Sequence, residues 1–563
     1  MLLPRLSPKK LRREPGAPGF GKGNGNGRRR QSLAFPGLRP TAGADLGHLT
    51  FSYCFILGAG QISKARIVGV TLPSMSPNKP DMSTLEPTSA PTRGVYSYYL
   101  AGQWLTSAQV VEVRSPYDQR VVGRVSMATP EHIEQAIEAA HKGFAITRKL
   151  AGYERQGALA KIAAELRGRS EEFAQCISAE AGKPIRTARS EVERAAFCFQ
   201  YAAEETTRLT GDLLPLDAQA ASKNRMGLLR RVPLGPVAAI TPFNFPLNLV
   251  AHKIAPALAA GCTIVLKPAT KTPLVALMLA DVVGRSGYPK EAVSILPMTT
   301  ENASPLVEDD RFKLLTFTGS SAAGWALKAR AGKKRVALEL GGNAGCIVHS
   351  DADIEVAAAR CAAGGFGYAG QSCISVQRIL VERNVFDPFI EKLTAAAQKL
   401  RLGDPGDEST EVGPMIRLSD AERAEQWIAE AVAQGAHIVC GGTRTGSMLA
   451  PTILTGTSET QRVNCQEIFA PVVTVEAYDD FGEAIERVNR SPYGLQAGVF
   501  TQDITRLLRA YDELEVGAVI AGDVPSFRID HMPYGGVKDS GIGREGVRYS
   551  IEEMTEPKLL VIS

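Results

Sequence analysis

Apolar and polar positions along the chain predict an alternation of strands and helices. From residue 96 onward, short apolar runs typical of strands are followed by long Ala-rich stretches, and over residues 131–166 the apolar positions recur at helical spacing. This order predicts an α/β fold with a doubly wound sheet, in which ligands bind beyond the carboxyl ends of the strands. Its predicted elements are strands over 237–241, 262–267 and 312–318 and a helix over 252–260.

The first 93 residues lack this pattern and end in a stretch rich in Pro, Ser and Thr. Residues 1–80 hold 13 Lys and Arg against two acidic residues, a formal charge of +11; since the whole chain carries +5, the rest carries −6. We therefore interpret residues 1–93 as a disordered basic leader. A targeting segment, or a start placed too far upstream of Met75 or Met82, fits the same composition.

Composition limits the classes of function. The chain has 563 residues, 44% hydrophobic and 22% charged, enough for three or four domains of roughly 150 residues. No stretch approaches the roughly 18 consecutive apolar residues of a membrane span, and the basic excess is confined to the leader, so we expect no membrane and no nucleic-acid partner. Nine cysteines without a C-x-x-C pair argue against disulfides and favour a reducing, cytoplasmic setting.

The loops after the first two strands carry candidate polar groups. The first reads T-P-F-N-F-P over residues 241–246. Held between aromatic residues and prolines, Asn244 would be a stiff amide donor suited to stabilising an oxyanion, and an Asx-type turn explains it equally well. Lys267 ends the next strand, where it can bind ribose hydroxyls or a phosphate, although a solvated lysine is the commoner use.

Glycines mark two further positions. The run from Gly319 to Gly324 leads from a strand into a helix, so its N–H groups would face an anion such as a pyrophosphate, unless the glycines serve helix packing. Glu339 lies in an apolar strand before Gly341 and Gly342. Desolvation there would raise its pKa, as a general base near neutrality requires; the alternative is a structural salt bridge.

A thiol and a second carboxylate complete the set. Cys373 follows Gly370 in G-Q-S-C, and because glycine lets the backbone approach a substrate, this thiol is the candidate nucleophile. The other eight cysteines are interpreted as small buried residues. Glu467 and Phe469, in Q-E-I-F-A-P, suit a ribose diol and a flat ring. The chain has no G-x-S-x-G or H-E-x-x-H motif, and we predict no catalytic metal.

Together and in this order, P-F-N-F-P, L-E-L-G-G, G-Q-S-C and E-I-F-A-P resemble the NAD(P)-dependent aldehyde dehydrogenase superfamily, from about residue 98 to residue 563. The resemblance implies a Rossmann-type cofactor domain, an α/β catalytic domain and a small β arm. It also implies that Cys373 is the nucleophile, that Glu339 activates water, that Asn244 and the Cys373 N–H hold the oxyanion, and that Lys253 relays protons. Implied cofactor contacts are Thr241, Pro242, Phe243, Lys267, Thr270, Gly319, Ser320, Gly324, Leu340, Gly341, Glu467 and Phe469.

One position departs from this pattern and bears on the cofactor. NAD-preferring members commonly carry Glu at the third residue after the lysine that matches Lys267, where it binds a ribose 2′-hydroxyl and repels a 2′-phosphate. Here that residue is Thr270, and Lys271 follows it. The resemblance therefore implies that NADP is accepted, in place of NAD or alongside it.

Residues 527–538, F-R-I-D-H-M-P-Y-G-G-V-K, are similar to the branch containing lactaldehyde, succinate-semialdehyde, phosphonoacetaldehyde and non-phosphorylating glyceraldehyde-3-phosphate dehydrogenases. This likeness implies oxidation of a small polar or anionic aldehyde, such as a semialdehyde or hydroxyaldehyde, to the acid through a thioester. Implied substrate contacts are Arg194, Phe245 and Arg528, although both arginines also suit ordinary surface roles. Phosphate-handling members tend to carry Arg just before the nucleophile; Ser372 stands there, which favours a carboxylate or hydroxyl aldehyde.

The same likeness divides the chain beyond its leader into three parts. These are a cofactor domain over residues 94–340 with an arm hairpin over 209–232, a catalytic domain over 341–540, and an oligomerisation segment over 541–563. Within the last part, residues 549–563 would extend a neighbour's sheet, which implies a homodimer or homotetramer.

Three other hypotheses use the same residues. A CoA-acylating aldehyde dehydrogenase would also use Cys373, but thiolysis by CoA needs no water-activating base such as Glu339. A catalytically silent NAD-binding structural protein is disfavoured by the joint presence of Cys373, Glu339 and Asn244. A thiol hydrolase would cleave esters without aldehyde-dependent reduction of the cofactor.

Overall fold

The computed structural model describes residues 94–563; the predicted leader, residues 1–93, lies outside the described residues. Short apolar strands build a first sheet with the order β2-β1-β9-β8-β7-β10-β11-β23. Its five strands from β9 to β11 are parallel and its outer strands are antiparallel. The bounds are β1 (Tyr98–Leu100), β2 (Gln103–Leu105), β7 (Val237–Ile240), β8 (Ile264–Lys267), β9 (Val293–Ile295), β10 (Leu314–Thr318), β11 (Arg335–Glu339) and β23 (Gly541–Ile542).

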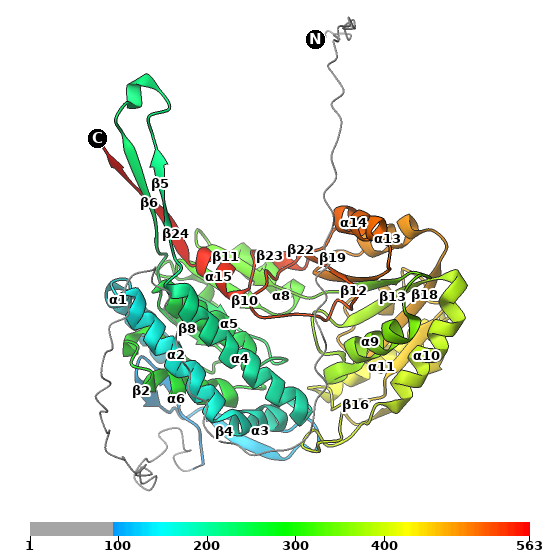
Figure 1. The fold of residues 1–563 in the computed structure, drawn as a ribbon. Coiled ribbons are helices and arrows are strands. Elements are labelled where there is room, and N and C mark those ends of the chain that lie inside the picture. The colour runs from blue at the N-terminus through cyan, green and yellow to red at the C-terminus, as the bar shows by residue number, and fades with distance from the viewer. Residues whose placement is uncertain (1–93) are drawn as a thin grey trace, which may run out of the picture. The chain divides into compact units, whose positions relative to one another are not determined.

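Helices cover this sheet on both faces, which confirms the predicted doubly wound α/β architecture (Figure 1). The helical pattern over 131–166 is two helices; the first begins after Thr129, whose side chain accepts a hydrogen bond from His132 N–H. The predicted helix over 252–260 begins earlier, at Asn248. The helices are α1 (Pro130–Thr147), α2 (Gly152–Gly168), α3 (Ser170–Ala181), α4 (Ile185–Thr206), α5 (Asn248–Ala260), α6 (Leu274–Arg285), α7 (Ser304–Glu308) and α8 (Ser321–Arg330).

A second sheet, with the order β14-β17-β18-β13-β12-β20-β21, follows the double glycine after β11. Side chains alternate across it: Cys346 and Val348 join the core under α9, α10 and α11, whereas Ile347 joins the core under α13 and α14. The strands are β12 (Ala344–Val348), β13 (Val376–Glu382), β14 (His437–Cys440), β17 (Thr452–Thr455), β18 (Val472–Tyr478), β20 (Gln496–Phe500) and β21 (Ala518–Ala521). The helices are α9 (Ile354–Phe366), α10 (Phe386–Lys399), α11 (Leu418–Ala433), α13 (Phe481–Asn489) and α14 (Ile504–Glu513).

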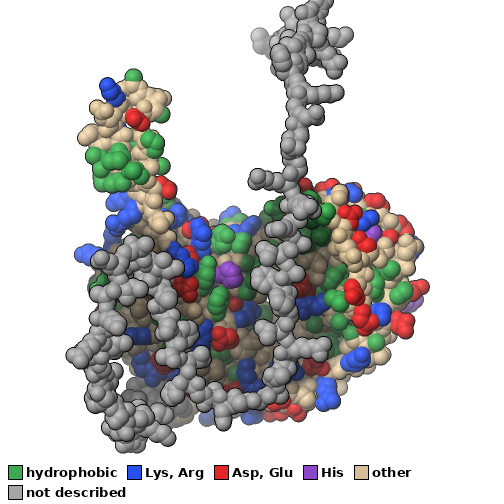
Figure 2. Space-filling model, in the orientation of Figure 1, with side chains coloured by type: hydrophobic (Ala, Val, Ile, Leu, Met, Phe, Trp, Pro, Cys, Tyr) green, Lys and Arg blue, Asp and Glu red, His purple; other side chains and the backbone are tan. Residues whose placement is uncertain are grey.

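A three-stranded antiparallel ribbon projects from the part of the molecule that contains the first sheet (Figure 1). It contains β5 (Gly211–Pro215), β6 (Met226–Pro233) and β24 (Thr555–Ile562), and β24 pairs with β6 along its whole length. Apolar side chains gather on this ribbon (Figure 2), and Leu213 is 62% exposed and Leu560 58% exposed. The smaller elements are β3 (Val110–Arg114), β4 (Val121–Ser126), β15 (Arg444–Thr445), β16 (Met448–Leu449), α12 (Arg462–Cys465), β19 (Tyr493–Gly494), β22 (Val537–Lys538) and α15 (Val547–Glu553).

Within residues 94–563, none of the helices combines the length and the apolar character that crossing a membrane requires. Over the same range, no group of three or more His, Cys, Asp and Glu side chains is placed to hold a metal ion.

Candidate active site

Most of the predicted site residues line a single cavity of about 350 Å³. Asn244, Glu339 and Cys373 face it together with the predicted substrate contacts Arg194, Phe245 and Arg528. Of the predicted cofactor contacts, those in the wall are Pro242, Phe243, Gly319, Ser320, Leu340, Gly341, Glu467 and Phe469. Those that do not line it are Thr241, Lys267, Thr270 and Gly324; the predicted relay residue Lys253 is also outside the wall.

The turn before β13 presents Cys373 in a strained backbone. Tyr368 and Ala369 adopt left-handed φ values of 49° and 52°, a conformation that side chains with a Cβ rarely take, and Gly370 follows at 67°. The thiol is half-buried, and its Sγ lies 2.8 Å from Oη of Tyr534. Burial raises the pKa of Cys373 to about 11, while the Tyr534 hydrogen bond and the charge of Arg528 act in the opposite direction.

The amide of Asn244 is directed at this turn. Its Nδ2 donates a hydrogen bond of 3.0 Å to the backbone carbonyl of Gln371, and its Oδ1 is buried without a partner among the described residues. Because an Asx-type turn needs Oδ1 as an acceptor, the alternative of such a turn is wrong. The Nδ2 hydrogen bond fixes the amide against the turn that carries Cys373, and both side chains line the cavity.

A buried ion pair holds the loop that carries Asn244. Lys183 Nζ is fully buried, pairs with Glu191 and donates 2.7 Å to the backbone carbonyl of Asn244. Glu191 Oε1 accepts the N–H groups of Leu247 at 2.9 Å and Asn248 at 3.1 Å. Both charges are thus satisfied by each other and by the backbone, which makes this pair a support of the loop.

Glu339 ends β11 as a buried carboxyl group, 4% exposed. Its Oε2 has no hydrogen-bond partner among the described residues, and no ion pair joins Glu339 to the cations that they contain. Burial, and next the charge of Glu545, raise the pKa of Glu339 well above its usual range. This matches the expected desolvated base and does not match the alternative of a structural salt bridge.

A cluster of charges lies beside Glu339. Glu545 pairs with Lys253 and, at 3.1 Å, with Arg528. Burial alone would raise the pKa of Glu545. The charges of Lys253, His252 and Arg528 nevertheless lower it to about 2. Lys253 therefore reaches the cavity through Glu545, which is in the wall.

The two predicted substrate arginines already have partners. Arg194 makes a bidentate pair with Asp530, at 3.0 Å from Nε and 2.8 Å from Nη2. Asp530 also accepts hydrogen bonds from Asn248 and His252. The Arg528 guanidinium lies 3.6 Å from the centre of the Tyr534 ring. Both arginines line the cavity and are held in fixed orientations by their carboxylate partners Asp530 and Glu545.

The residues predicted to hold the cofactor lie at the carboxyl ends of β7, β8 and β10. Lys267 is 8% exposed and burial lowers its pKa, so the alternative of a solvated lysine is wrong. The hydroxyls of Thr241 and Thr318 are buried without partners among the described residues. A nucleotide bound at these strand ends would supply hydrogen-bond partners for the unpaired hydroxyls. The residues present therefore fit a nucleotide cofactor.

The loop of Glu467 supplies the other side of this region. Glu467 Oε1 accepts a hydrogen bond of 2.9 Å from Gly342 N–H, and burial raises the pKa of Glu467 to about 7. Phe469 has a left-handed φ of 50° and its ring meets that of Phe243 edge-on at 6.0 Å. This region therefore offers an aromatic side chain to a flat ring and a carboxylate to a ribose.

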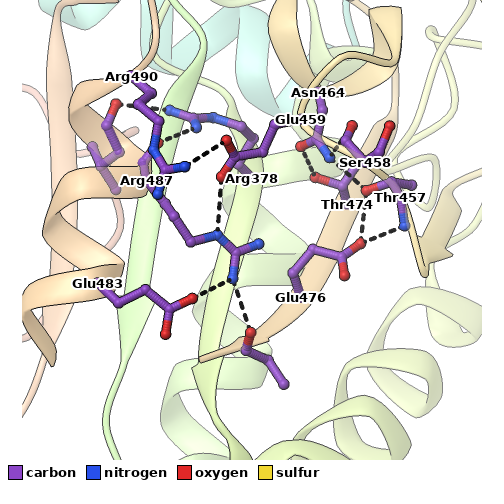
Figure 3. A network of polar contacts seen from close by, with 12 residues as sticks. Arg378, Thr457, Ser458, Glu459, Asn464, Thr474, Glu476, Glu483, Arg487 and Arg490 are labelled. Atoms are coloured by element: carbon purple, nitrogen blue, oxygen red, sulfur yellow. Dashed lines mark hydrogen bonds and ion pairs between the residues drawn. The ribbon is translucent and has the colours of Figure 1, made fainter. Parts of the chain in front are cut away.

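Close packing explains the double glycine. A Cβ on Gly341 would lie 2.2 Å from Oε2 of Glu467, and one on Gly342 would lie 2.3 Å from the carbonyl oxygen of Cys373. The next residue, Asn343, accepts hydrogen bonds through its backbone carbonyl from the buried Arg378, which also donates to the carbonyl of Arg487. Figure 3 shows Arg378 within this network, which fixes the backbone beyond the two glycines.

Five residues were missed by the sequence analysis: Lys183, Glu191, Asp530, Tyr534 and Glu545. All five are buried, and four of them are charged. Tyr534 and Asp530 stand inside the motif 527–538, which gave no reason to assign them a role. Glu191 stands in the polar stretch R-S-E-V-E-R, so its neighbours in the sequence gave no signal that it is buried.

Comparisons with known proteins identify the family of this chain. The model of the aldehyde dehydrogenase family matches residues 104–560. A 3-sulfolactaldehyde dehydrogenase of Priestia aryabhattai is 46% identical over 83% of this chain and 98% of its own. The structure of aldehyde dehydrogenase 21 from Physcomitrella patens in complex with the reaction product succinate has a TM-score of 0.82 and 45% identity, covering 83% of this chain and 98% of that one. The glyceraldehyde-3-phosphate dehydrogenase GapN of Methanocaldococcus jannaschii, complexed with NADP, has a TM-score of 0.78 and 39% identity, covering 80% and 99%.

A doubly wound sheet whose strand ends meet a thiol, an amide and a buried carboxyl group defines an oxidoreductase with a nucleotide cofactor. The chain belongs to the aldehyde dehydrogenase family. It oxidises an aldehyde group and depends on NAD or NADP, as predicted.

Proposed function

We propose that this enzyme oxidises a small anionic or hydroxylated aldehyde to the carboxylic acid, with Cys373 as its nucleophile. The observation that carries the proposal is the meeting of Cys373, Asn244 and Glu339 with two arginines in the wall of one cavity. A thiol, an amide donor and a desolvated base are the groups that acyl chemistry at an aldehyde carbon needs.

Each of these residues has a proposed step. The Cys373 sulfur attacks the carbonyl carbon, and the Asn244 amide with the Cys373 N–H stabilises the negative oxygen. When bound, NAD(P) supplies the acceptor for the hydride that leaves this carbon. Glu339 then takes a proton from the water that hydrolyses the thioester; its raised pKa suits a base that works near neutrality. Lys253 and Glu545 relay protons away from Glu339.

The proposed binding of the cofactor uses both sides of the strand ends. Lys267, Thr241 and Gly319 to Gly324 hold the phosphates and adenosine ribose, while Glu467 and Phe469 hold the nicotinamide ribose and ring. Thr270 presents no carboxylate to a 2′-phosphate, so we propose that NADP is accepted. The NADP complex of GapN supports this proposal. A preference for NAD above a hundredfold in kcat/KM would contradict it.

The proposed substrate is anionic because two arginines line the cavity wall. Arg194 and Arg528 carry positive charge there, and Phe245 covers the aliphatic part of a short chain. The names of the relatives point the same way: 3-sulfolactaldehyde carries a sulfonate, and aldehyde dehydrogenase 21 holds the dicarboxylate succinate. Ser372 before the nucleophile favours a carboxylate or a hydroxyl group over a phosphate.

A panel of short aldehydes tests the proposal through the absorbance of the reduced cofactor. Succinate semialdehyde should exceed uncharged butanal in kcat/KM, and Arg194→Gln and Arg528→Gln should each reduce this preference by roughly ten- to a hundredfold, because each removes a charge-assisted contact. Arg186→Gln, an exposed arginine on α4, is the control. Activity retained in Cys373→Ala, or acyl-CoA as the product when CoA is added, would contradict the proposal.

The remaining proposals concern organisation. We propose that residues 94–340 form the cofactor domain, 341–540 the catalytic domain, and that the ribbon of β5, β6 and β24 with the segment 541–563 joins subunits into a dimer or tetramer. The exposed leucines of the ribbon support an interface there. A reducing, cytoplasmic setting fits the eight described cysteines, all of which are free thiols.

A further inference from the structure

The hydroxyl of Tyr534 is the hydrogen-bond partner that the described residues give to the sulfur of Cys373, at 2.8 Å. The position of Tyr534 is fixed from two sides. The Tyr534 N–H donates a hydrogen bond of 2.9 Å to the carbonyl of Glu545. The Glu545 N–H donates one of 2.6 Å to the carbonyl of Tyr534. With the side chain 2% exposed and the backbone tied in this way, the hydroxyl has little freedom to turn away from the thiol.

The chemistry of the phenol makes it a donor in this contact. Burial, and next the charge of Cys373, raise the pKa of Tyr534 well above its usual range, so the hydroxyl keeps its proton at any working pH. A phenol that cannot ionise donates to a thiolate more strongly than it accepts from a neutral thiol. The Arg528 guanidinium stacked 3.6 Å from the ring centre draws electron density from the phenol and strengthens the donor.

Other charges face the same sulfur and act in both directions. Arg528 favours the thiolate, whereas Glu467 and Glu339 disfavour it. The thiol is also half-buried, and within residues 94–563 no lysine or histidine lines the cavity to pair with it. The thiolate therefore depends on Arg528 and on a neutral donor.

We propose that Tyr534 is a positioning residue for the nucleophile, whose hydroxyl donates to the Cys373 sulfur, favours the thiolate and directs it into the cavity, with Arg528 supporting the donor from behind. The proposal rests on the assignment of Cys373 as nucleophile in the proposed function. When the sulfur bonds to the aldehyde carbon it loses its negative charge, so the hydrogen bond weakens and does not hold the sulfur back.

The test is Tyr534→Phe, which removes one oxygen and leaves the ring under Arg528. The cofactor-free full chain is labelled with iodoacetamide from pH 7 to pH 10, and labelling of Cys373 is followed by peptide mass spectrometry. Loss of a hydrogen bond to a charged sulfur shifts the thiol pKa upward by about one to two units. Because a more basic thiolate is also more nucleophilic, labelling at pH 7.5 should fall roughly three- to tenfold, with the profile shifted to higher pH.

Tyr288→Phe is the matched control. It removes a buried hydroxyl that donates 2.9 Å to the carbonyl of Leu258, away from the cavity, and should leave the profile unchanged. A Tyr534→Phe profile that superimposes on the wild type, or faster labelling at pH 7.5, overturns the proposal. If Tyr534→Phe does not fold, Arg528→Gln should shift the profile the same way, and an unchanged profile overturns the proposal as well. Aldehyde oxidation by Cys373→Ala reports separately on the proposed function.

Discussion

Two buried lysine–glutamate pairs flank the cavity, and they differ in how completely they are satisfied. In the first, Lys183 and Glu191 bond to each other and to backbone groups of the Asn244 loop. In the second, Glu545 is shared between Lys253 and Arg528, and its charge acts on the neighbouring Glu339.

The difference distinguishes a pair that supports the backbone from a cluster that changes the pKa of a neighbouring carboxyl group. A pair whose charges are fully bonded holds backbone in place, here the loop of Asn244. A cluster that leaves a carboxyl group buried without a partner shifts the pKa of that group toward neutrality, where proton transfer is useful. Three substitutions test this contrast.

The largest effect is expected from Glu339→Gln, at the unpartnered carboxyl group. The amide cannot take a proton from water, so turnover should fall by roughly 10² to 10⁴. Formation of the thioester does not need this base. A rapid-mixing experiment should therefore show one equivalent of reduced cofactor per active site, followed by slow turnover. Steady-state turnover equal to that of the wild type would end the assignment.

The second effect is on stability, from Glu191→Ala in the closed pair. It leaves Lys183 buried with an unpaired charge, so the free energy of unfolding should fall by about 3–5 kcal/mol. Urea unfolding measures it. Glu193→Ala on the same helix is the control, since its ion pair with Arg167 is exposed and should contribute at most about 1 kcal/mol. Equal losses for the two variants would show that the closed pair gives no special support.

The smallest effect is a pH shift, from Glu545→Gln in the open cluster. The charge of Glu545 raises the pKa of Glu339, and its removal also leaves the positive charges of Lys253 and Arg528 uncompensated. Both changes lower the pKa of Glu339, so the base stays ionised at lower pH. The acid limb of kcat should move down by about one pH unit; a move upward would contradict this account.

The sequence predicted the parts of the site that follow strand ends. Asn244, Glu339 and Cys373 each stand two or three residues from a Pro or Gly in a short motif, and each could be assigned a role from that motif. The partners could not be predicted in this way. Tyr534 lies 161 residues from Cys373, and Lys183 lies 61 residues from Asn244, so these contacts exist only once the two sheets and their helices have packed. The alternation of strands and helices could be predicted for the same reason as the motifs, because it is a local pattern in the sequence.

Gly370, the first residue of the G-Q-S-C motif, packs closely against a distant segment of the chain. A Cβ on Gly370 would lie 2.1 Å from the carbonyl oxygen of Ala470, so the turn that presents the sulfur rests directly on the segment that ends the E-I-F-A-P motif. The turn before Cys373 and the segment of Phe469 and Ala470 therefore constrain one another, so a substitution that moves one of these backbone segments should also move the other.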